Sequence, residues 1–482
     1  MAREVHRVLL LNPPAPDLVI RDNYCSKTTK SNLVPHPVDL LMQSGRLAER
    51  FEIAVHDAVA ERWDEAACLA RILAWQPDAV FFLSGDVSWD ADLPFMRRVK
   101  DALGGDTVLI GSGDCFLEAP AEWLRAHPHL DGLALDFSTD DVARFLRRDD
   151  DALEHFALRR DGEVRVVDRP RQRKAAYRVP RPRHDLFRHP NYHFSFLRRR
   201  PWATVMTDFG CPYPCTFCLQ SVIGSKYRPV DDVMDELRHL VSMGVQDVLF
   251  HDQTWGVYRQ RNLELCAAMV AEGFDLGWTT FTRVDVVDDE VLDAWKAAGC
   301  HTLMFGVEFA SADMLKRYRK GYRPAQIVEG LERTRRHGIR TVGTFLLGLP
   351  EETRETMEAT IRLACDLPLD YASFNVAVPR HGTPLRAQAK TMGLLDEGAT
   401  MDQSGAYVMM GTETLTPAEV LAAKRRAVRR FYLRPRWLYE RARAMGSWAE
   451  LGWQVREGAA LLARNARLGR APAVRPDLPA SG

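Results

Sequence analysis

The sequence predicts an α/β protein in which a doubly wound parallel sheet is followed by a partial (β/α)6 barrel and a helical C-terminal region. Three observations support this prediction. Short apolar segments alternate with longer helical patterns over residues 7–146, the alternation stops between residues 152 and 202, and a second alternating series begins at residue 203. Alternation of strands and helices at this spacing is typical of crossover connections in parallel sheets.

The first series predicts five strands, each followed by a helix. The strands are almost continuously apolar, as expected when helices cover both faces of a parallel sheet. This pattern favours a flavodoxin-like doubly wound domain over residues 1–150, with its ligand crevice at the carboxyl ends of the strands. The expected strands are 7–11, 51–57, 78–85, 106–113 and 130–137, and the expected helices are 39–50, 64–75, 92–103, 121–127 and 140–146.

Residues 151–202 do not continue this alternation. Residues 156–170 predict a small hairpin that turns at Asp161 and Gly162, and the stretch after them is rich in Pro and Arg. A hairpin followed by a Pro-rich stretch is typical of a connecting segment. We therefore expect a hairpin and linker between two domains.

The second series predicts six strand-and-helix units over residues 203–385, enough for a three-quarter version of the eightfold barrel. Residues 386–482 are expected to form a helical, basic C-terminal region. The expected barrel strands are 203–210, 245–253, 276–285, 301–308, 340–350 and 371–379, and the expected helices are 231–244, 262–273, 289–299, 324–338 and 355–367.

Composition excludes several classes of protein. Lys and Arg balance Asp and Glu at 65 each, so no overall charge favours nucleic acid as a partner. The apolar N-terminal run is only a strand long and two prolines follow it, which does not resemble a signal peptide. No uninterrupted apolar run of about 18 residues appears. We therefore expect a cytoplasmic protein.

Cysteine usage points to a metal site. The chain has nine cysteines, and three of them, Cys211, Cys215 and Cys218, lie within eight positions. Thiolates suit iron–sulfur clusters, and a tight loop with three of them can bind three corners of a cubane and leave the fourth iron open. Structural zinc is the alternative, but it needs four protein ligands and no fourth Cys or His lies nearby in register.

These residues carry a resemblance to a known family. The sequence resembles the cobalamin-binding class of radical S-adenosylmethionine (SAM) enzymes from about residue 7 to 435. The Cys-x3-Cys-x2-Cys loop, with Phe217 before its last cysteine, follows the first barrel strand, as the family requires. Further landmarks follow in order at 247–255, 281–285, 298–308, 344–353 and 376–385.

The resemblance implies a [4Fe–4S] cluster on the three cysteines and SAM bound at the open iron. One electron from the cluster would then break the sulfonium bond and give a 5′-deoxyadenosyl radical, which abstracts hydrogen from unactivated carbon. It also implies an electron donor such as flavodoxin or ferredoxin.

The resemblance further implies candidate cofactor-binding residues. Asp252 matches the position of a contact to the methionine amine, and Arg283 and Glu308 are candidates for ribose or methionine contacts. Glu308 could instead form an ion pair with Arg283. Gly343, Gly348 and Pro350 are residues that would let the backbone approach the adenine closely. As the alternative, the glycines could be bulge and helix-cap residues.

The N-terminal domain of the family resembles methylcobalamin carriers, so cobalamin is an expected cofactor. Ser84, Gly111 and Gly113 lie in the predicted crevice loops and are the candidate contacts. The chain lacks the Asp-x-His-x-x-Gly motif, so no histidine ligand to cobalt is expected from it. Residues 133–141 also depart from the Gly-Glu-Gly-Glu turn of many relatives, which leaves open a domain that has lost its ligand.

Two further features have more than one interpretation. Cys300 precedes the fourth barrel strand, at the end opposite to barrel chemistry, and we interpret it as a core residue. Residues 424–445 carry nine Lys or Arg among aromatic residues. Such a segment can lie on an anionic membrane surface, or it can be a solvated face packed beside the barrel.

The leading functional hypothesis is methyl transfer from methylcobalamin to an unactivated carbon of a hydrophobic substrate, such as an isoprenoid lipid. The alternative is a radical cyclase or oxidative enzyme acting on a tetrapyrrole-like or other substrate. A non-catalytic iron–sulfur protein is a third class. The residues expected to bind SAM are present in the sequence, which argues against this third class.

Overall fold

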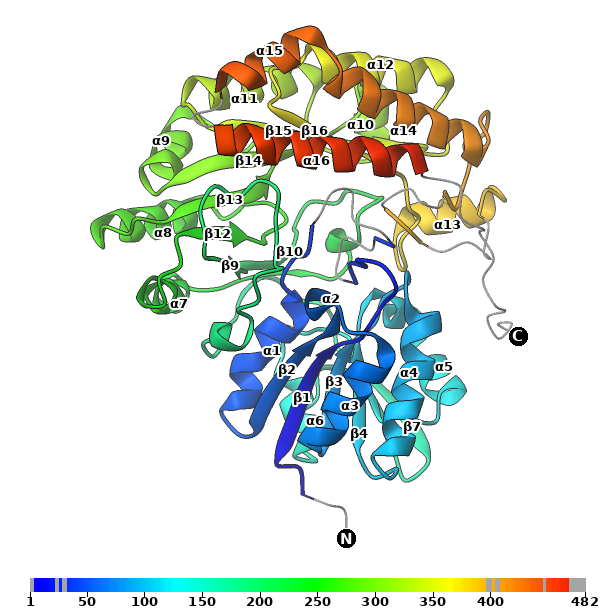
Figure 1. The fold of residues 1–482 in the computed structure, drawn as a ribbon. Helices are drawn as coiled ribbons and strands as arrows, with labels where there is room; N and C mark the ends of the chain where they lie inside the picture. Colours follow the sequence, from blue (N-terminus) through cyan, green and yellow to red (C-terminus); the bar gives the residue numbers. More distant parts are fainter. Residues whose placement is uncertain are drawn as a thin grey trace.

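The computed structural model describes residues 4–21, 26–27, 33–395, 401–403, 408–444 and 448–467. Figure 1 shows two α/β layers stacked one above the other, with the N-terminal sheet in blue below and the barrel in green and yellow above. The last helices, in orange and red, lie against the barrel.

The lower domain contains a seven-stranded sheet with the order β2-β1-β3-β4-β5-β6-β7. Its first five strands are parallel, and their order is that of the flavodoxin-like fold, so the predicted doubly wound class is confirmed. The strands are β1 (Arg7–Asn12), β2 (Glu52–Asp57), β3 (Ala79–Leu83), β4 (Val108–Ser112), β5 (Gly132–Ala134), β6 (His155–Arg160) and β7 (Glu163–Asp168). The helices are α1 (Val38–Ala48), α2 (Ala58–Glu61), α3 (Glu65–Trp75), α4 (Trp89–Ala102), α5 (Pro120–Ala126) and α6 (Asp141–Leu146).

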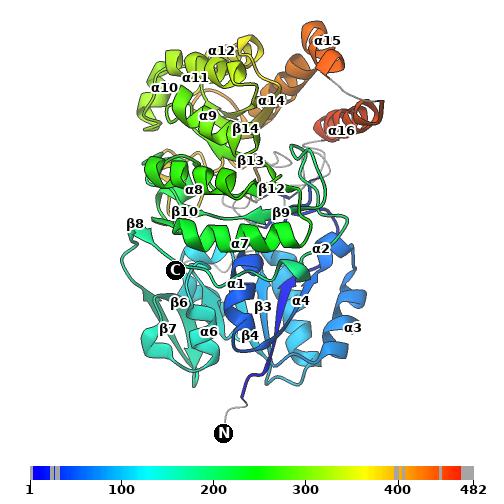
Figure 2. The same ribbon diagram turned by 90° about the vertical axis from the view of Figure 1, so that its left-hand side faces the viewer.

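Strands β6 and β7 form the predicted hairpin, but not in a connecting segment. Strand β6 pairs antiparallel with β5, so the hairpin extends the first sheet. The turn at Asp161 and Gly162 has φ values of 49° and 84°, the left-handed conformation that two-residue hairpin turns require. Phe156 and Leu158 are buried, and this burial explains why the hairpin joins the sheet. Figure 2 shows it at one side of the lower domain. The domain boundary at residue 150 remains a prediction.

The upper domain contains six parallel strands in the order β9-β12-β13-β14-β15-β16, as expected for a partial barrel. Helices α7 and α8 lie outside the strands (Figure 2). The strands are β9 (Trp202–Val205), β12 (Asp247–Phe250), β13 (Gly277–Thr282), β14 (Cys300–Glu308), β15 (Arg340–Leu347) and β16 (Tyr371–Val376). The helices are α7 (Val230–Ser242), α8 (Arg259–Ala271), α9 (Asp289–Ala297), α10 (Ala312–Arg317), α11 (Pro324–Arg336) and α12 (Arg354–Asp366).

A small third sheet holds the loop with the three cysteines. Sequence analysis expected one strand over 203–210, but the segment divides into β9 and β10 (Asp208–Gly210). Strand β10 pairs antiparallel with β11 (Ser225–Tyr227), which pairs in parallel with β8 (Arg173–Ala176). The connecting segment therefore supplies one strand to the base of the cysteine loop.

The C-terminal region is helical, as predicted, with α13 (Pro384–Thr391), α14 (Pro417–Tyr432), α15 (Pro435–Ala444) and α16 (Trp448–Arg467). Helix α14 begins with a Thr416 cap, packs against β16 and buries Phe431 completely. Cys300 is 1% exposed at the start of β14, which confirms its interpretation as a core residue. Among the residues described above, no helix has both the length and the apolar character needed to cross a membrane.

Candidate active site

A cavity of about 470 Å³ lies within the barrel and toward the carboxyl ends of its strands. Cys211, Cys215 and Cys218 all line it. Many of its other walls are aromatic or aliphatic: Phe194, Phe196, Phe217, Phe281, Met304, Val342, Leu346, Tyr371, Phe374, Val428, Tyr432, Trp437 and Leu461. The structure thus brings the predicted cysteine motif to a mostly apolar cavity.

Backbone contacts hold the cysteine loop in place. The backbone N–H of Cys211 lies 3.1 Å from the carbonyl oxygen of Gln220 and 3.2 Å from that of Gly224. Gly210 has a φ of 70°, and a Cβ atom there would lie 2.1 Å from the Gly224 oxygen. Only glycine therefore fits directly before Cys211. Backbone contacts and this glycine therefore shape the start of the loop.

An iron–sulfur cluster on the three thiols stays a prediction. Within the described part of the chain, no three His, Cys, Asp or Glu side chains gather as one metal-ion group. A cubane binds each thiolate to a different iron, so its ligands stand farther apart than those around one ion. Burial and the neighbouring thiols Cys215 and Cys211 raise the pKa of Cys218 to about 12, so a bound cation is needed to hold it as thiolate.

Arg283 supports the cysteine loop from β13. Its guanidinium lies 3.7 Å from the centre of the Tyr213 ring, within the loop, and bonds to Asp285 at 2.7 Å. Glu308 bonds to Lys320 at 2.8 Å. The sequence-based alternative of a Glu308–Arg283 ion pair is therefore wrong, because each residue has a nearer partner of opposite charge. Arg283 and Glu308 both line the cavity.

Asp252 lies outside the cavity lining and bonds to the protein itself. Its Oδ1 accepts the backbone N–H groups of Thr207 at 2.7 Å and Asp208 at 3.0 Å, and its Oδ2 accepts the Thr207 hydroxyl. Asp252 thus fixes the turn between β9 and β10. Its expected contact to the methionine amine stays a prediction.

The small residues predicted to approach the adenine contact protein atoms. A Cβ on Gly343 would lie 2.7 Å from Leu369, and one on Gly348 would lie 2.6 Å from Val420. The Pro350 carbonyl accepts the Glu413 N–H. Because side chains alternate along a strand, other residues of β15 face the cavity. These residues are Val342, Thr344 and Leu346.

Two glutamines that sequence analysis did not select face the cavity. The side-chain Nε2 atoms of Gln220 and Gln253 are buried without a hydrogen-bond partner, and both residues line the cavity. A buried amide donor without a partner is unfavourable unless a ligand accepts from it. Gln220 lies two residues after Cys218 and Gln253 directly follows Asp252, but neither position carries a sequence signal of its own.

The crevice residues of the first sheet are also packed against protein. Ser84 is fully buried and its hydroxyl donates to Asp92 at 3.0 Å. A Cβ on Gly113 would lie 1.8 Å from the Ser84 carbonyl oxygen, and one on Gly111 would lie 2.8 Å from the Phe116 ring. The small residues at Gly111 and Gly113 therefore serve the packing of β3 and β4.

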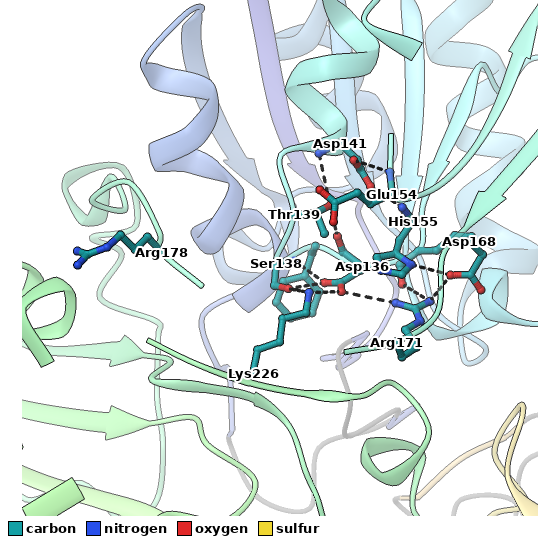
Figure 3. Close-up of polar contacts among 12 residues, drawn as sticks. Asp136, Ser138, Thr139, Asp141, Glu154, His155, Asp168, Arg171, Arg178 and Lys226 are labelled. Carbon is teal, nitrogen blue, oxygen red and sulfur yellow. Dashed lines mark hydrogen bonds and ion pairs between the residues drawn. The ribbon is translucent and has the colours of Figure 1, made fainter. Parts of the chain in front are cut away.

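The loop that follows β5 contacts the small sheet of β10, β11 and β8, which holds the cysteine loop (Figure 3). Lys226 on β11 lies 2.7 Å from Asp136 and 2.9 Å from the Ser138 hydroxyl. Arg171 lies 3.5 Å from the same carboxylate. Burial alone would raise the pKa of Asp136, but Lys226 and Ser138 lower it below its ordinary value. The Asp136–Lys226 ion pair therefore connects the loop after β5 with strand β11.

The lower domain nevertheless contributes to the cavity. Ile20, Ser26 and Leu33, from the segment between β1 and α1, line it together with the cysteines. Arg380, which follows β16, also lines it and bonds to Asp114 of the lower domain at 2.8 Å. A ligand at the carboxyl edge of the first sheet would thus face the cysteine loop.

Comparison with known proteins agrees with this architecture. Residues 207–364 match the family model described as the Radical SAM superfamily. The chain is 27% identical over 444 residues to an uncharacterized methyltransferase of Pyrococcus horikoshii, covering 90% of this chain and 94% of that protein.

Two further relatives match a shorter stretch. An anaerobic magnesium-protoporphyrin IX monomethyl ester cyclase of Cereibacter sphaeroides is 32% identical over 47% of this chain. A hopanoid C-3 methylase of Methylococcus capsulatus is 30% identical over 38% of this chain. The matches cover only 38% and 36% of those two proteins.

Solved structures show the same fold. The radical SAM methyltransferase TsrM of Kitasatospora setae, solved with cobalamin and a [4Fe–4S] cluster, matches with a TM-score of 0.61 at 18% identity, over 80% of this chain and 75% of that one. The cobalamin-dependent radical SAM enzyme OxsB matches with a TM-score of 0.66 at 14% identity, over 89% of this chain and 66% of that one. The match to the Radical SAM superfamily thus covers the barrel residues 207–364, and the two solved structures share the fold of the chain.

Proposed function

We propose that the protein is a cobalamin-dependent radical SAM methyltransferase that acts on an unactivated carbon of a hydrophobic substrate. The observation that carries this proposal is the shared cavity: the three cysteines, the segment after β1 of the lower domain and many aromatic side chains all line it. The methyltransferase relative, which matches over 90% of the chain, supports methyl transfer. The hopanoid methylase relative supports a lipid-like substrate.

The chemistry that the bound cofactors supply is formation of a 5′-deoxyadenosyl radical by a reduced [4Fe–4S] cluster and SAM, and donation of a methyl group by methylcobalamin. The residues of the chain would hold and shield these groups. Cys211, Cys215 and Cys218 would bind the cluster. Gln220 and Gln253 would donate to the polar groups of SAM, which would satisfy their buried amides.

The cations near the loop have a positioning role. Arg283 stacks on Tyr213, and its Nη1 lies 4.0 Å from the sulfur of Cys215. Lys320 lines the same wall and pairs with Glu308. Positive charge beside a thiolate stabilises its ionised form, which favours cluster binding. The apolar walls exclude water from a reactive radical.

The position of the first sheet relative to the cavity supports cobalamin as a cofactor. The carboxyl edge of the first sheet is where doubly wound domains bind ligands, and Ile20, Ser26 and Leu33 extend that edge into the cavity. Ser84, Gly111 and Gly113 also contact protein atoms, and their contact with cobalamin stays a prediction.

The runner-up is a radical cyclase or oxidative enzyme, which the similarity to the protoporphyrin ester cyclase supports. The two functions differ in their products. Methyl transfer consumes a second SAM to restore the methyl donor and leaves S-adenosylhomocysteine, whereas a cyclase using the same radical yields 5′-deoxyadenosine alone.

The test uses the full-length chain with reconstituted cluster, reduced cobalamin and SAM under anaerobic conditions. We expect S-adenosylhomocysteine whose formation depends on added cobalamin, together with 5′-deoxyadenosine that depends on the cluster, both measured by mass spectrometry. Formation of 5′-deoxyadenosine without cobalamin-dependent S-adenosylhomocysteine would contradict methyl transfer and favour the runner-up.

The proposed partners follow from the same chemistry. Radical formation needs one electron from a donor such as flavodoxin or ferredoxin. A peripheral contact with a membrane is proposed from the α14–α15 corner, where Leu433, Leu438 and Tyr439 are 53%, 49% and 65% exposed beside exposed Arg429 and Arg436. Exposed apolar side chains interspersed with cations are typical of surfaces that bind anionic lipid.

A further inference from the structure

The short loop between α10 and α11, residues 318–323, lies directly against the cysteine loop. The backbone N–H of Thr216 lies 3.3 Å from the carbonyl oxygen of Tyr318. The Cys215 thiol lies 3.8 Å from the carbonyl oxygen of Arg319. Figure 2 shows α10, which leads into this loop, at the margin of the upper domain. The α10–α11 loop therefore joins the cysteine loop to the outside of the barrel.

This loop reaches the thiols from solvent and not from the cavity. Arg319 is exposed, although its carbonyl oxygen lies beside the Cys215 thiol. Thr254 and Arg283 also approach thiols, at 3.5 Å and 4.0 Å, but both are buried and line the cavity. Under the proposed function that cavity holds SAM. A protein that approaches the cysteine loop from outside would thus meet Arg319.

A group of unpaired cations lies on this loop and at the ends of its two helices. Residues 312–323 contain five Lys or Arg and one acidic residue. Three of these cations are exposed and form no ion pair with any residue that the structure describes: Lys316, Arg319 and Arg323. We call them the α10–α11 cations. Because the chain has no net charge, their positive charge is a local feature of this surface.

The basic corner of α14 and α15 differs in this respect. Arg426 and Arg430 both pair with Glu358, and Arg436 pairs with Glu440. An exposed arginine that already has an acidic partner contributes less to the recognition of another negative charge. The α10–α11 cations have no such partner among the described residues, and their field would steer an acidic surface toward them.

We propose that the α10–α11 cations are the docking site of an acidic electron-carrier protein, and that the electron enters through the α10–α11 loop toward Cys215. This inference rests on the proposed function, which requires a one-electron reduction of a cluster on the cysteines. In that step the carrier loses one electron and the cluster gains it, and no bond forms or breaks. Redox partners associate through small interfaces, so a loop with its flanking helix ends is large enough.

The position of these cations favours an electron carrier over other acidic partners. Electron transfer weakens steeply with distance, so a donor must dock where the protein surface lies close to the cluster. Arg319 meets this requirement, because it is exposed and its backbone contacts a thiol. A nucleic acid or an anionic membrane could use the same charge, but neither needs to lie near Cys215. Binding of either one is a competing outcome of the test.

The first measurement is binding of an oxidised, acidic bacterial flavodoxin to the full-length, cluster-reconstituted protein. Isothermal titration calorimetry is done at low ionic strength, where exposed charges interact most strongly. Lys316→Glu with Arg323→Glu should weaken binding about tenfold, because attraction becomes repulsion. Arg97→Glu with Arg125→Glu is the matched control: it makes the same change in net charge at exposed positions of the lower domain and should keep the wild-type affinity.

The second measurement is the rate of cluster reduction, followed anaerobically by the loss of the cluster's visible absorbance. With reduced flavodoxin, Lys316→Glu with Arg323→Glu should be reduced about tenfold more slowly than the wild type, and added salt should diminish this difference. Dithionite is small and needs no docking site, so it should reduce both proteins equally fast. If the double variant does not fold, Lys316→Glu alone should show an effect of about threefold in the same comparison.

Three results would overturn the proposal. The first is equally fast reduction by flavodoxin in the wild type and in Lys316→Glu with Arg323→Glu. The second is an equal slowing in the Arg97→Glu with Arg125→Glu control. The third is binding of RNA or of phosphatidylglycerol vesicles that the α10–α11 variant loses while it keeps its affinity for flavodoxin. Neither measurement detects products, so absence of cobalamin-dependent S-adenosylhomocysteine would contradict methyl transfer and leave this docking site standing.

Discussion

The carboxyl edges of the two parallel sheets are built in different ways. At the barrel edge, three cysteines and two unsatisfied amide donors face a cavity. At the edge of the first sheet, the polar groups that sequence analysis and the fold place there are satisfied by the protein, as in the Lys226–Asp136 and Arg380–Asp114 pairs. The comparison teaches that the same strand-and-helix pattern can leave amide donors without partners at one edge and, at another, use its charged groups in contacts with the rest of the protein.

The largest effect should come from the cysteines. Replacing Cys211, Cys215 or Cys218 with Ala should reduce bound iron and sulfide to background, because each thiolate holds one iron of the cubane. Iron and sulfide analysis of anaerobically reconstituted protein measures this. Cys300→Ala is the control and should keep a full cluster. A full cluster in all three single variants would mean that the barrel edge is not the cluster site.

The next effect concerns the ion pair between the two edges. Lys226→Met should lower the free energy of unfolding by about 3 kcal/mol, because it leaves the buried Asp136 carboxylate without its main partner. Urea titration measures the loss. Asp235→Ala, which breaks the exposed Arg181–Asp235 pair, should cost less than about 1 kcal/mol.

The double variant Asp136→Asn with Lys226→Met should recover most of the loss, since neither charge then remains buried alone. If the double variant is no more stable than Lys226→Met, Asp136 and Lys226 do not act as a pair.

The free energy of unfolding should depend on pH with opposite signs for one carboxyl group at each of the two edges. Burial raises the pKa of Glu352, in the loop after β15, from 4.5 to about 7. Between those values the folded protein binds a proton that the unfolded chain has released, so this group makes stability fall as pH rises. Asp136, whose pKa is lowered from 3.8, contributes stability that is lost only as pH falls below that value.

Urea unfolding of the wild type and Glu352→Gln from pH 5 to 7.5 should therefore show a shallower slope in the variant, by up to about 1.4 kcal/mol per pH unit. Identical slopes would show that Glu352 does not hold its proton in this range.

The smallest effect should come from the glutamines. Gln220→Leu and Gln253→Leu should each weaken SAM binding about fivefold, which corresponds to about 1 kcal/mol for one hydrogen bond. Equilibrium dialysis with unreduced, cluster-loaded protein measures the affinity, and the exposed Gln246→Leu serves as control. Unchanged SAM affinity in both variants would show that the amide groups of Gln220 and Gln253 do not bind SAM, and the proposed difference between the two edges would be lost.

Much of the architecture was predictable from the sequence. Apolar runs such as those within Arg7–Asn12 and Ala79–Leu83 are typical of buried strands, and their alternation with helical patterns predicts a parallel topology. The crowding of Cys211, Cys215 and Cys218 identified the loop that reaches the cavity. The hairpin at residues 155–168 was recognised, but its pairing with β5 depends on a long-range contact that local pattern does not encode.

The individual contacts were harder to predict. Gly343 and Gly348 carry the residue type expected for close approach to a ligand, yet Leu369 and Val420 fill the space beside them. Which face of β15 meets the cavity depends on strand register, which the sequence alone left undetermined. Gln220 and Gln253 are ordinary residue types, and only the fold brings them to one cavity.

The central claim is that the barrel edge binds a cluster that cleaves SAM. The most direct test is formation of 5′-deoxyadenosine by the anaerobically reconstituted full-length protein with SAM and dithionite, without any substrate. The account predicts 5′-deoxyadenosine from the wild type and from Cys300→Ala, and none above background from Cys218→Ala. A wild-type protein that carries a full cluster and yields no 5′-deoxyadenosine, or a Cys218→Ala variant that yields as much as the wild type, would contradict it.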